Sequence, residues 1–423
     1  MKVGFIGVGK LGLPVTISMD MRGHDVLGYD INPNITEHTK PADILVTHEV
    51  MDDGVTNLMV QAKKSGVKFT KNLRTILEHG DIIFCAVQTP HDIRYEGVTR
   101  MPDEKIDFDY RYLIDSMKQI SAILDEIEQD KIVIIISTVL PGTIRKHIFP
   151  IMSKHIKLCY NPYFIAMGTV MYDFFNPEFI LLGVHDEHAK EVVKEFYKTI
   201  TPAPVFETSI ENAEMIKVSY NTFITAKICL ANNIMLMCDN LPNVDCDEVL
   251  RALTMANSRL ISSKYLTGGM GDGGGCHPRD NIALAWLSNE LGLKENYYEN
   301  MMKCRDFQTE YIANIIHKYK TKHPDLDVIL LGKSFKPNTN LTVGSPATLL
   351  MNILKEQNVD VAKHFDPYID TEPIKLEKAI YCISTKHDDF RNYNFPEGST
   401  VIDPHRYLSV GTGVIYVPIG VGK

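Results

Sequence analysis

The feature that most constrains this chain lies in its first 30 residues, where a strand, a glycine-rich turn, a helix and a second strand follow one another. The turn is Gly7-Val8-Gly9-Lys10-Leu11-Gly12, and the second strand ends at Asp30. Glycines in this pattern permit a tight turn, close approach of a pyrophosphate and close packing of the helix on the strand. A carboxylate at Asp30 can accept hydrogen bonds from a ribose diol and would repel a 2′-phosphate. The order predicts a dinucleotide-binding Rossmann unit, with NAD favoured over NADP; the alternative is a turn that happens to be rich in glycine.

Two further apolar strands are expected at residues 81–87 and 131–136, and each ends in a polar turn. In a doubly wound sheet the carboxyl ends of the strands line the ligand crevice, so Thr89 and Thr138 are candidate cofactor contacts. The alternative is ordinary turn chemistry for threonine. Residues 91–107 are charged and poor in apolar side chains, which favours an exposed insertion.

A strand–helix rhythm returns near the carboxyl end of the chain, with strands expected at 327–332, 359–365 and 378–383. It indicates a second parallel α/β domain, whose glycines do not form a second dinucleotide fingerprint. Lys333 and Lys336 follow the first of these strands and can hold phosphates or form a surface pair. A chain of 423 residues suits two or three domains. The predicted fold is α/β, with two Rossmann-like doubly wound parallel-sheet domains joined by a long central helix.

The central helix is expected to begin at a capping box over Thr208-Ser209-Ile210-Glu211 and to continue to about Cys238. Lys217 and Asn221 are four residues apart and therefore share one face. A lysine beside an amide on a partly apolar face suits an electrostatic or proton-transfer role. On the helix pattern alone, a solvated lysine is the favoured interpretation. A helix this long often spans two domains or packs against a copy of itself.

A glycine-rich segment at 268–275 has six glycines in eight residues and leads directly into Cys276. Glycine is costly in entropy, so the run predicts a loop that needs positive φ or close approach, most simply to a bulky polar ligand. A helix starting near Cys276 would favour a thiolate there and would place Asp280 one turn further on the same face. A thiol beside a carboxylate under such a loop indicates covalent catalysis. The alternative is a flexible linker with an incidental cysteine.

The composition excludes several classes of protein. The net charge is −9 without a long basic run, which argues against a general nucleic-acid binder. A strand follows Met1 almost at once and no apolar stretch is long enough to span a bilayer, so neither a signal peptide nor a membrane segment is expected. The eight cysteines form no Cys-x-x-Cys pair, so no metal site is expected. Cysteines in apolar surroundings, with Cys276 as the exception, favour a reducing cytoplasmic location.

Six motifs, in this order and spacing, resemble those of one enzyme family. They are Gly7-x-Gly9-x-x-Gly12 with Asp30, Val87-Gln88-Thr89-Pro90, Ser137-Thr138-Val139-Leu140-Pro141-Gly142-Thr143, Lys217-x-x-x-Asn221, Gly273-Gly274-Gly275-Cys276-x-Pro278-Arg279-Asp280 and Phe335-Lys336-Pro337-Asn338-Thr339. Over essentially its whole length the chain resembles the UDP-glucose/GDP-mannose 6-dehydrogenases. The resemblance implies an NAD-binding domain at 1–205, a central region at 206–318 with a dimerisation helix and the cysteine loop, and a C-terminal domain at 319–423 that holds the nucleotide diphosphate.

The resemblance also implies a reaction and a homodimer. Similar enzymes oxidise the C6 alcohol of a nucleotide sugar to a carboxylate with two NAD⁺, and UDP-glucose is the default substrate. Cys276 would trap the aldehyde and form a thioester, Lys217 and Asn221 would stabilise the oxyanion, and Asp280 would activate water or relay protons. The expected cofactor contacts are Gly7, Val8, Gly9, Lys10, Leu11, Gly12, Asp30, Thr89 and Thr138. The expected substrate contacts are Tyr163, Lys217, Asn221, Tyr265, Gly273 and Lys336.

The chain departs from the family pattern in the segment Asn161-Pro162-Tyr163-Phe164-Ile165-Ala166-Met167-Gly168. The family carries glutamates at the positions of Tyr163 and Met167, and one of them is commonly assigned to acid–base work on the thioester. Hydrolysis would then rest on Asp280 or be slow. Two other functions stay open: a two-electron β-hydroxyacid dehydrogenase, which would leave Cys276 and the C-terminal domain unexplained, and a nucleotide-sugar-binding relative with impaired turnover.

Overall fold

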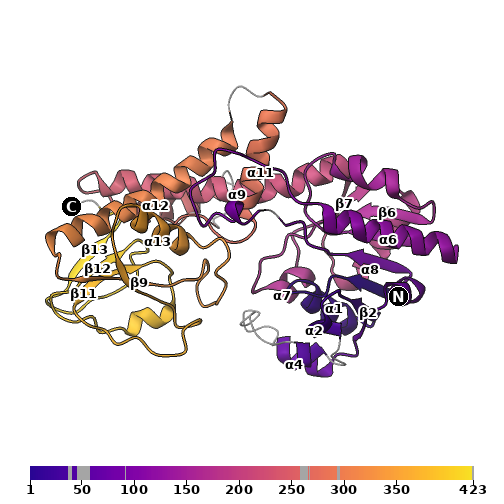
Figure 1. Cartoon of the computed structure of the whole chain (residues 1–423), viewed down its shortest axis with the longest axis horizontal. Helices are drawn as coiled ribbons and strands as arrows, with labels where there is room; N and C mark the ends of the chain where they lie inside the picture. The colour runs from indigo at the N-terminus through magenta and orange to yellow at the C-terminus, as the bar shows by residue number, and fades with distance from the viewer. Residues whose placement is uncertain are drawn as a thin grey trace. The chain divides into compact units, whose positions relative to one another are not determined.

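The computed structural model describes residues 1–36, 41–44, 58–90, 92–257, 265, 267–292 and 296–421 (Figure 1). The chain folds as two compact units, each of which is described by itself. The first contains Met1–Pro90 and Phe108–Ser219, and the second contains His91–Asp107 and Tyr220–Lys423. The three-part division at residues 205 and 318 stays a prediction.

An eight-stranded sheet forms the centre of the first unit, in the order β3-β2-β1-β4-β5-β6-β7-β8. Every neighbouring pair is parallel except β6 and β7, which are antiparallel. The strands are β1 (Lys2–Ile6), β2 (Asp25–Tyr29), β3 (Lys68–Thr70), β4 (Ile82–Cys85), β5 (Lys131–Ile135), β6 (Ile156–Tyr160), β7 (Ile180–Val184) and β8 (Val205–Ser209).

Helices cover this sheet so that its central strands are inaccessible to water. Each residue of β4 and β5 is buried, as expected when both faces of a parallel sheet are covered. The first helix is buried from Gly12 to Met19, which explains why its sequence is apolar on all sides. The helical elements are α1 (Gly12–Met21), α2 (Pro33–Thr36), α3 (Pro41–Ile44), α4 (Leu58–Lys64), α5 (Leu73–His79), α6 (Arg111–Ile127), η2 (Ile144–Ile148), η3 (Phe149–Ile151), α7 (Val170–Phe175) and α8 (Glu187–Ile200).

The long central helix, α9 (Ile210–Asp239), has 30 residues, and the boundary between the two units falls within it. Its predicted extent is confirmed, but the predicted capping box is wrong. The hydroxyl of Ser209, rather than that of Thr208, accepts the backbone N–H of Asn212 at 3.3 Å. Thr208 does not cap the helix because α9 begins at Ile210, one residue later than the capping box requires, and the Thr208 hydroxyl instead accepts the side-chain amide of Asn212.

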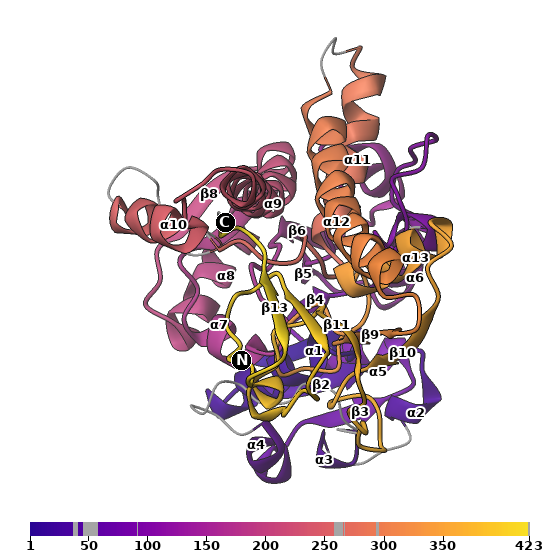
Figure 2. The same ribbon diagram turned by 90° about the vertical axis from the view of Figure 1, so that its left-hand side faces the viewer.

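The second unit is built on a five-stranded parallel sheet in the order β10-β9-β11-β12-β13 (Figure 2). Its strands are β9 (Asp327–Leu331), β10 (Val361–Phe365), β11 (Ala379–Ile383), β12 (Thr400–Asp403) and β13 (Ile415–Pro418). Its helical elements are η1 (Ile93–Tyr95), α10 (Cys246–Met255), α11 (His277–Glu290), α12 (Tyr297–Lys322), α13 (Pro346–Glu356) and η4 (Asp388–Asn392). The predicted fold class, two α/β sheets and a long central helix, is confirmed.

The segment that follows β4 differs from its expectation. Residues 92–107 do not form an exposed insertion, because Tyr95 is buried against Ile282 of α11 and Met302 of α12. Charged side chains of the segment are used in ion pairs, including Arg100 with Glu310 at 3.4 Å. The polar composition of residues 92–107 therefore gave no indication that this segment is packed against helices. Among the described helices, none has both the length and the apolar character needed to cross a membrane.

Candidate functional site

The glycine turn after β1 has the geometry that a bound pyrophosphate needs. Gly7 has φ +97°, and a Cβ built there would lie 2.6 Å from the carbonyl oxygen of Ala86. A Cβ on Gly12 would lie 2.1 Å from the oxygen of Gly7, so both glycines are required for packing. A Cβ on Gly9, in contrast, would meet no described atom within 4 Å. The middle glycine thus leaves open space beside the first turn of α1, where its N–H groups can receive a phosphate.

The other expected cofactor contacts lie at the carboxyl ends of neighbouring strands. Thr89 follows β4 and Thr138 follows β5, and the Thr89 hydroxyl donates to the Thr138 carbonyl oxygen at 2.7 Å. Asp30 follows β2, and its carboxylate accepts the backbone N–H of Asn32 at 2.8 Å. In the strand order, β1 and β4 flank the position where the direction of winding reverses, which is where open α/β sheets bind ligands. The residues present therefore fit a dinucleotide.

Lys217 of α9 is buried rather than solvated, so the interpretation favoured by the helix pattern alone is wrong. Its ammonium group donates to the main-chain oxygen of Tyr163 at 2.9 Å and lies 5.1 Å from the ring centre of Phe164. Only 8% of the residue is exposed. The local sequence could not show this, because the residues that cover Lys217 come from a segment more than fifty positions earlier.

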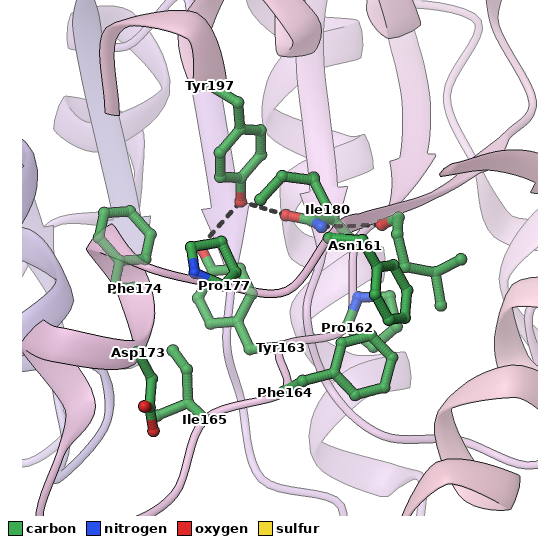
Figure 3. Close-up of a pocket in the computed structure, with 12 residues that line it drawn as sticks. Asn161, Pro162, Tyr163, Phe164, Ile165, Asp173, Phe174, Pro177, Ile180 and Tyr197 are labelled. Carbon is green, nitrogen blue, oxygen red and sulfur yellow. Dashed lines mark hydrogen bonds between the residues drawn. The ribbon is translucent and has the colours of Figure 1, made fainter. Parts of the chain in front are cut away.

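The segment from Asn161 onward surrounds a small cavity of about 20 Å³, which has room for roughly one water molecule (Figure 3). The Tyr197 hydroxyl donates to the Asn161 side-chain oxygen and lies 3.5 Å from the Tyr163 hydroxyl. Burial raises the pKa of Tyr163 well above its ordinary value of 10, and the neighbouring Tyr197 adds to the effect. The phenol that replaces a family glutamate is therefore protonated at neutral pH and cannot serve as a base.

Cys276 and Asp280 lie one turn apart at the start of α11, as predicted. Cys276 is exposed at the N-cap position, and its carbonyl oxygen accepts the backbone N–H of Asp280 at 2.9 Å. The carboxylate of Asp280 is completely buried. It accepts the side-chain amide of Asn221 at 2.5 Å and the guanidinium Nε of Arg279 at 2.9 Å. The second unit thus brings together three of the four predicted catalytic residues.

The glycines before Cys276 are explained by packing within the chain, so the expected ligand is not needed to account for them. A Cβ on Gly269 would lie 2.6 Å from the ring of His405, and one on Gly273 would lie 2.6 Å from Pro346. Gly274 has φ +88° and faces the ring of Phe335. The loop before Cys276 therefore lies against the segment that contains Phe335 and Lys336. The fold thus brings together two motifs that are about sixty residues apart in the sequence.

The carboxyl ends of β9, β10 and β11 carry a buried polar network. The imidazole of His387 contacts the carboxylate of Asp366 at 3.0 Å, and both side chains are fully buried. Burial alone would raise the pKa of Asp366, but the hydrogen bonds from His387 and from the backbone N–H of Lys333 lower it to about 2. The ammonium group of Lys333 pairs with Asp370 at 2.6 Å, so this lysine already has an anionic partner. Lys336 is half-buried in the same loop, and Tyr265 is exposed with φ +65°.

Comparisons with known proteins decide the family. The model for the NAD binding domain of the UDP-glucose/GDP-mannose dehydrogenase family matches residues 1–201, and the model for the central domain of that family matches residues 211–306. The chain belongs to this family. It is accordingly an NAD-dependent oxidoreductase of the nucleotide-sugar dehydrogenase kind.

Several members of the family align with most of the chain. UDP-glucose 6-dehydrogenase AglM of Haloferax volcanii is 29% identical over 87% of this chain and 83% of its own length. UDP-glucose 6-dehydrogenase YwqF of Bacillus subtilis is 26% identical over 87% and 80%. A solved UDP-glucose dehydrogenase from Pyrobaculum islandicum superposes with a TM-score of 0.81 at 23% identity and covers 100% of this chain and 98% of that one, which supports the fold.

This family member contains a group of buried polar side chains that the sequence motifs did not reveal. Asp272 is 2% exposed and accepts the hydroxyl of Thr225 and the imidazole Nδ1 of His277, both at 2.8 Å. Burial alone would raise the pKa of Asp272, but His277 and Thr225 hold it below its usual range. The guanidinium of Arg305 donates to the main-chain oxygen of Asp272 at 2.9 Å. In the sequence, this group of buried side chains could have been found only from the position of Asp272, an aspartate within a run of glycines.

Exposure of the cysteines also differs from the expectation in one respect. Cys276 and Cys304 are both exposed, whereas the other six cysteines are buried. Cys304 lies on α12 and has no carboxylate one turn away that resembles Asp280, since Gln308 occupies that position. Exposure alone therefore does not distinguish the candidate nucleophile, but its place at the N-terminus of α11 does.

Proposed function

We propose that this chain oxidises the C6 alcohol of a nucleotide sugar to a carboxylate, with Cys276 as the covalent nucleophile and two NAD⁺ consumed per sugar. UDP-glucose is the default substrate, since relatives named UDP-glucose 6-dehydrogenase align over most of the chain; a GDP-mannose 6-dehydrogenase and a UDP-N-acetyl-D-mannosamine dehydrogenase align as well. The observation that carries the proposal is the exposed thiol of Cys276 at a helix N-terminus, one turn from the buried Asp280.

The proposed chemistry balances over two oxidations. NAD⁺ supplies the hydride acceptor in each of them. The C6 alcohol first loses a proton and a hydride to give the aldehyde. The thiol of Cys276 adds to the aldehyde carbon to form a thiohemiacetal, which loses its hydroxyl proton and a second hydride and becomes a thioester. Water then cleaves the carbon–sulfur bond, releasing the carboxylate and restoring the thiol. One sugar, two NAD⁺ and one water thus yield one carboxylate, two NADH and three protons.

The side chains of the chain have distinct roles in this proposal. The ammonium group of Lys217 and the amide of Asn221 stabilise the oxyanion that develops on the substrate. The amide nitrogen of Asn221 carries two N–H bonds, so the one that bonds to Asp280 leaves a second for this role. Asp280 relays protons or activates the hydrolytic water. Because Tyr163 cannot act as a base, we assign thioester hydrolysis to Asp280.

The partners and location are also part of the proposal. We assign nucleotide contacts to Gly273, Tyr265 and Lys336, because the cysteine loop packs against the Phe335 segment of the C-terminal sheet. The molecule is proposed to act as a homodimer through α9. The absence of disulfides among its eight cysteines fits a reducing cytoplasm.

The experiment that tests the proposal measures NADH formed per sugar consumed and the mass of the product. A panel of nucleotide sugars, including UDP-glucose, UDP-N-acetylhexosamines and GDP-mannose, is compared. We expect two NADH per sugar and a carboxylate, and in Cys276→Ser at most the first oxidation without acid. Two outcomes would contradict the proposal. Tight binding with no NADH from any sugar indicates a binding protein, and one NADH with an aldehyde or ketone product and no carboxylate indicates a two-electron dehydrogenase.

A further inference from the structure

The segment of residues 92–107, which we call the strap, leaves the first unit directly after Pro90 and packs on the helices of the second unit (Figure 2). It is held there by several independent contacts. The amide of Asn352 on α13 donates to the Val98 carbonyl oxygen at 2.6 Å. Arg100 is paired with Glu310 of α12 and, at 3.1 Å, with Glu356 of α13. The strap is thus a fixed part of the second unit.

The turn of the strap at Gly97 touches the first turn of the helix that begins after Cys276. Gly97 has φ +73°, and a Cβ built on it would lie 2.6 Å from the Cβ of Pro278. Pro278 follows Cys276 by two residues and lies in the first turn of α11. The position of the strap therefore limits where the start of this helix can lie.

A buried arginine joins the strap to the cysteine loop. The side chain of Arg305 on α12 is 0% exposed. Its Nη2 donates to the Gly97 carbonyl oxygen at 2.6 Å and its Nε donates to the Asp272 carbonyl oxygen at 2.9 Å. Asp272 in turn binds His277 and Thr225 through its carboxylate. A single planar guanidinium thereby fixes both segments that flank the start of α11.

Asp306, the carboxylate that pairs with Arg305, also binds the main chain of the strap. Nη1 of Arg305 lies 3.3 Å from the carboxylate of Asp306, whose second oxygen accepts the backbone N–H of Met101 in the strap at 2.9 Å. A buried ion pair adds little net stability compared with apolar packing, because both groups lose their hydration. Arg305 and Asp306 also bind main-chain groups of the strap and of the cysteine loop. The ion pair is therefore better explained as a device that orients these two segments than as a source of stability.

We propose that Arg305 is a positioning residue: through Gly97 and Asp272 it holds the strap and the cysteine loop so that the sulfur of Cys276 stays at the N-terminus of α11. For its effect on turnover, the inference rests on the proposed function. The bidentate geometry is specific to arginine, because a lysine ammonium is a point donor that cannot reach two carbonyl oxygens in this fork arrangement. A lysine at position 305 would therefore keep the positive charge but would not hold both segments in place.

The experiment compares Arg305→Lys with Arg100→Met in the full chain, both in a Cys304→Ser background that leaves Cys276 as the exposed thiol. Arg100 is the matched control, because it also anchors the strap but through half-exposed ion pairs. The readouts are the rate of Cys276 alkylation by iodoacetamide, located by mass spectrometry, and kcat and KM for NADH formation. Gly97→Ala, which drives a Cβ against Pro278, perturbs the same contact from the strap side.

We expect Arg305→Lys and Gly97→Ala to alkylate more slowly, because the sulfur moves away from the positive end of the α11 helix dipole, which promotes the reactivity of a thiol. We expect kcat to fall by about 10- to 100-fold, as for a misplaced reacting group, with little change in KM for NAD⁺. Arg100→Met should match its background in both measurements. Faster or unchanged alkylation, or an unchanged kcat, overturns the inference. If the parent protein makes no NADH from any nucleotide sugar, the proposed function fails, while the alkylation rates still decide the role of Arg305.

Discussion

At the scale of single residues, Glu214 of α9 is a buried acid whose ionisation is coupled to the fold. Its carboxylate accepts the backbone N–H groups of Gly142 and Ile144, at 2.6 and 2.9 Å. Burial raises its pKa from 4.5 to about 7, and the two hydrogen bonds only partly oppose this effect. These bonds hold the loop that follows β5, which includes Thr138. The protonation state of one side chain on α9 therefore affects a loop at the proposed cofactor edge.

The stability of the protein should change with pH because of this residue. The folded state binds the proton of Glu214 more tightly than the unfolded chain, so the free energy of unfolding falls as pH rises from about 4.5 to about 7. In Glu214→Gln this contribution is removed. We expect the unfolding free energy of the parent minus that of the variant to fall by up to about 3 kcal/mol between pH ~5 and ~8. Denaturant unfolding of both proteins across this range measures the difference.

Glu211 provides the control for this prediction. It pairs with Arg145 at the surface, and the hydrogen bond from that guanidinium lowers its pKa. Stability from such a group is present above its unfolded-state pKa and is lost only as pH falls below that value. The difference between the parent and Glu211→Gln should therefore change little between pH ~5 and ~8, because the charge of Glu211 contributes less than burial to the raised pKa of Glu214. If the difference in unfolding free energy from the parent changed with pH in the same way for Glu211→Gln and Glu214→Gln, Glu214 would not be the cause of the pH dependence.

The residues of the candidate site show what local sequence can and cannot reveal. Cys276 and Asp280 share a helix turn, so their proximity follows from their spacing. The bond between Asn221 and Asp280 joins positions 59 residues apart, and the bond between Arg305 and Gly97 joins positions 208 apart. Contacts of this kind depend on how helices pack. The sequence could predict a role for Asn221 in the site only through the family resemblance, and it could not predict any role for Arg305.

At the scale of secondary-structure elements, apolar runs bounded by turns predicted the central strands well. β4 and β5 are buried at every position, and apart from Lys131 at the start of β5 their sequences are continuously apolar. The antiparallel pairing of β7 with β6 was not predictable, because strand direction depends on the connection and not on the pattern within the strand. The strap was mistaken for an exposed insertion because its charges are satisfied by partners on distant helices.

The helix α9 carries exposed apolar side chains that should form the dimer contact. Met215, Phe223 and Leu230 are exposed, and their spacing of eight and seven residues places them on one side of the helix. We expect Phe223→Glu combined with Leu230→Glu to convert a dimer to a monomer, because charges on this face would be buried without partners. Light scattering coupled to size-exclusion chromatography measures the mass.

Phe307→Glu is the matched control, since Phe307 is an exposed aromatic residue on α12. It should leave the mass unchanged. A monomeric parent protein, or a dimer that survives both substitutions in α9, would exclude this face as the dimer contact.

At the scale of the whole molecule, the two units have separate apolar cores. The first core includes Phe5, Phe84 and Ile134 from the eight-stranded sheet. The second includes Val328 and Ile380 from the five-stranded sheet, together with Met235 from the carboxyl-terminal half of α9. Because a domain with its own core can unfold cooperatively by itself, two unfolding transitions are expected.

The one tryptophan of the chain can separate these transitions. Trp286 lies on α11, within the second unit, so its fluorescence should follow only that unit, whereas circular dichroism follows both. NAD⁺ that binds the first unit at about 100 times its Kd should stabilise it by roughly 2.7 kcal/mol. We therefore expect NAD⁺ to raise the denaturation midpoint of one circular dichroism transition and to leave that of Trp286 fluorescence unchanged, while UDP raises the fluorescence midpoint. Coincident transitions that both ligands shift together would instead mean that α9 and the strap couple the two cores into one cooperative unit.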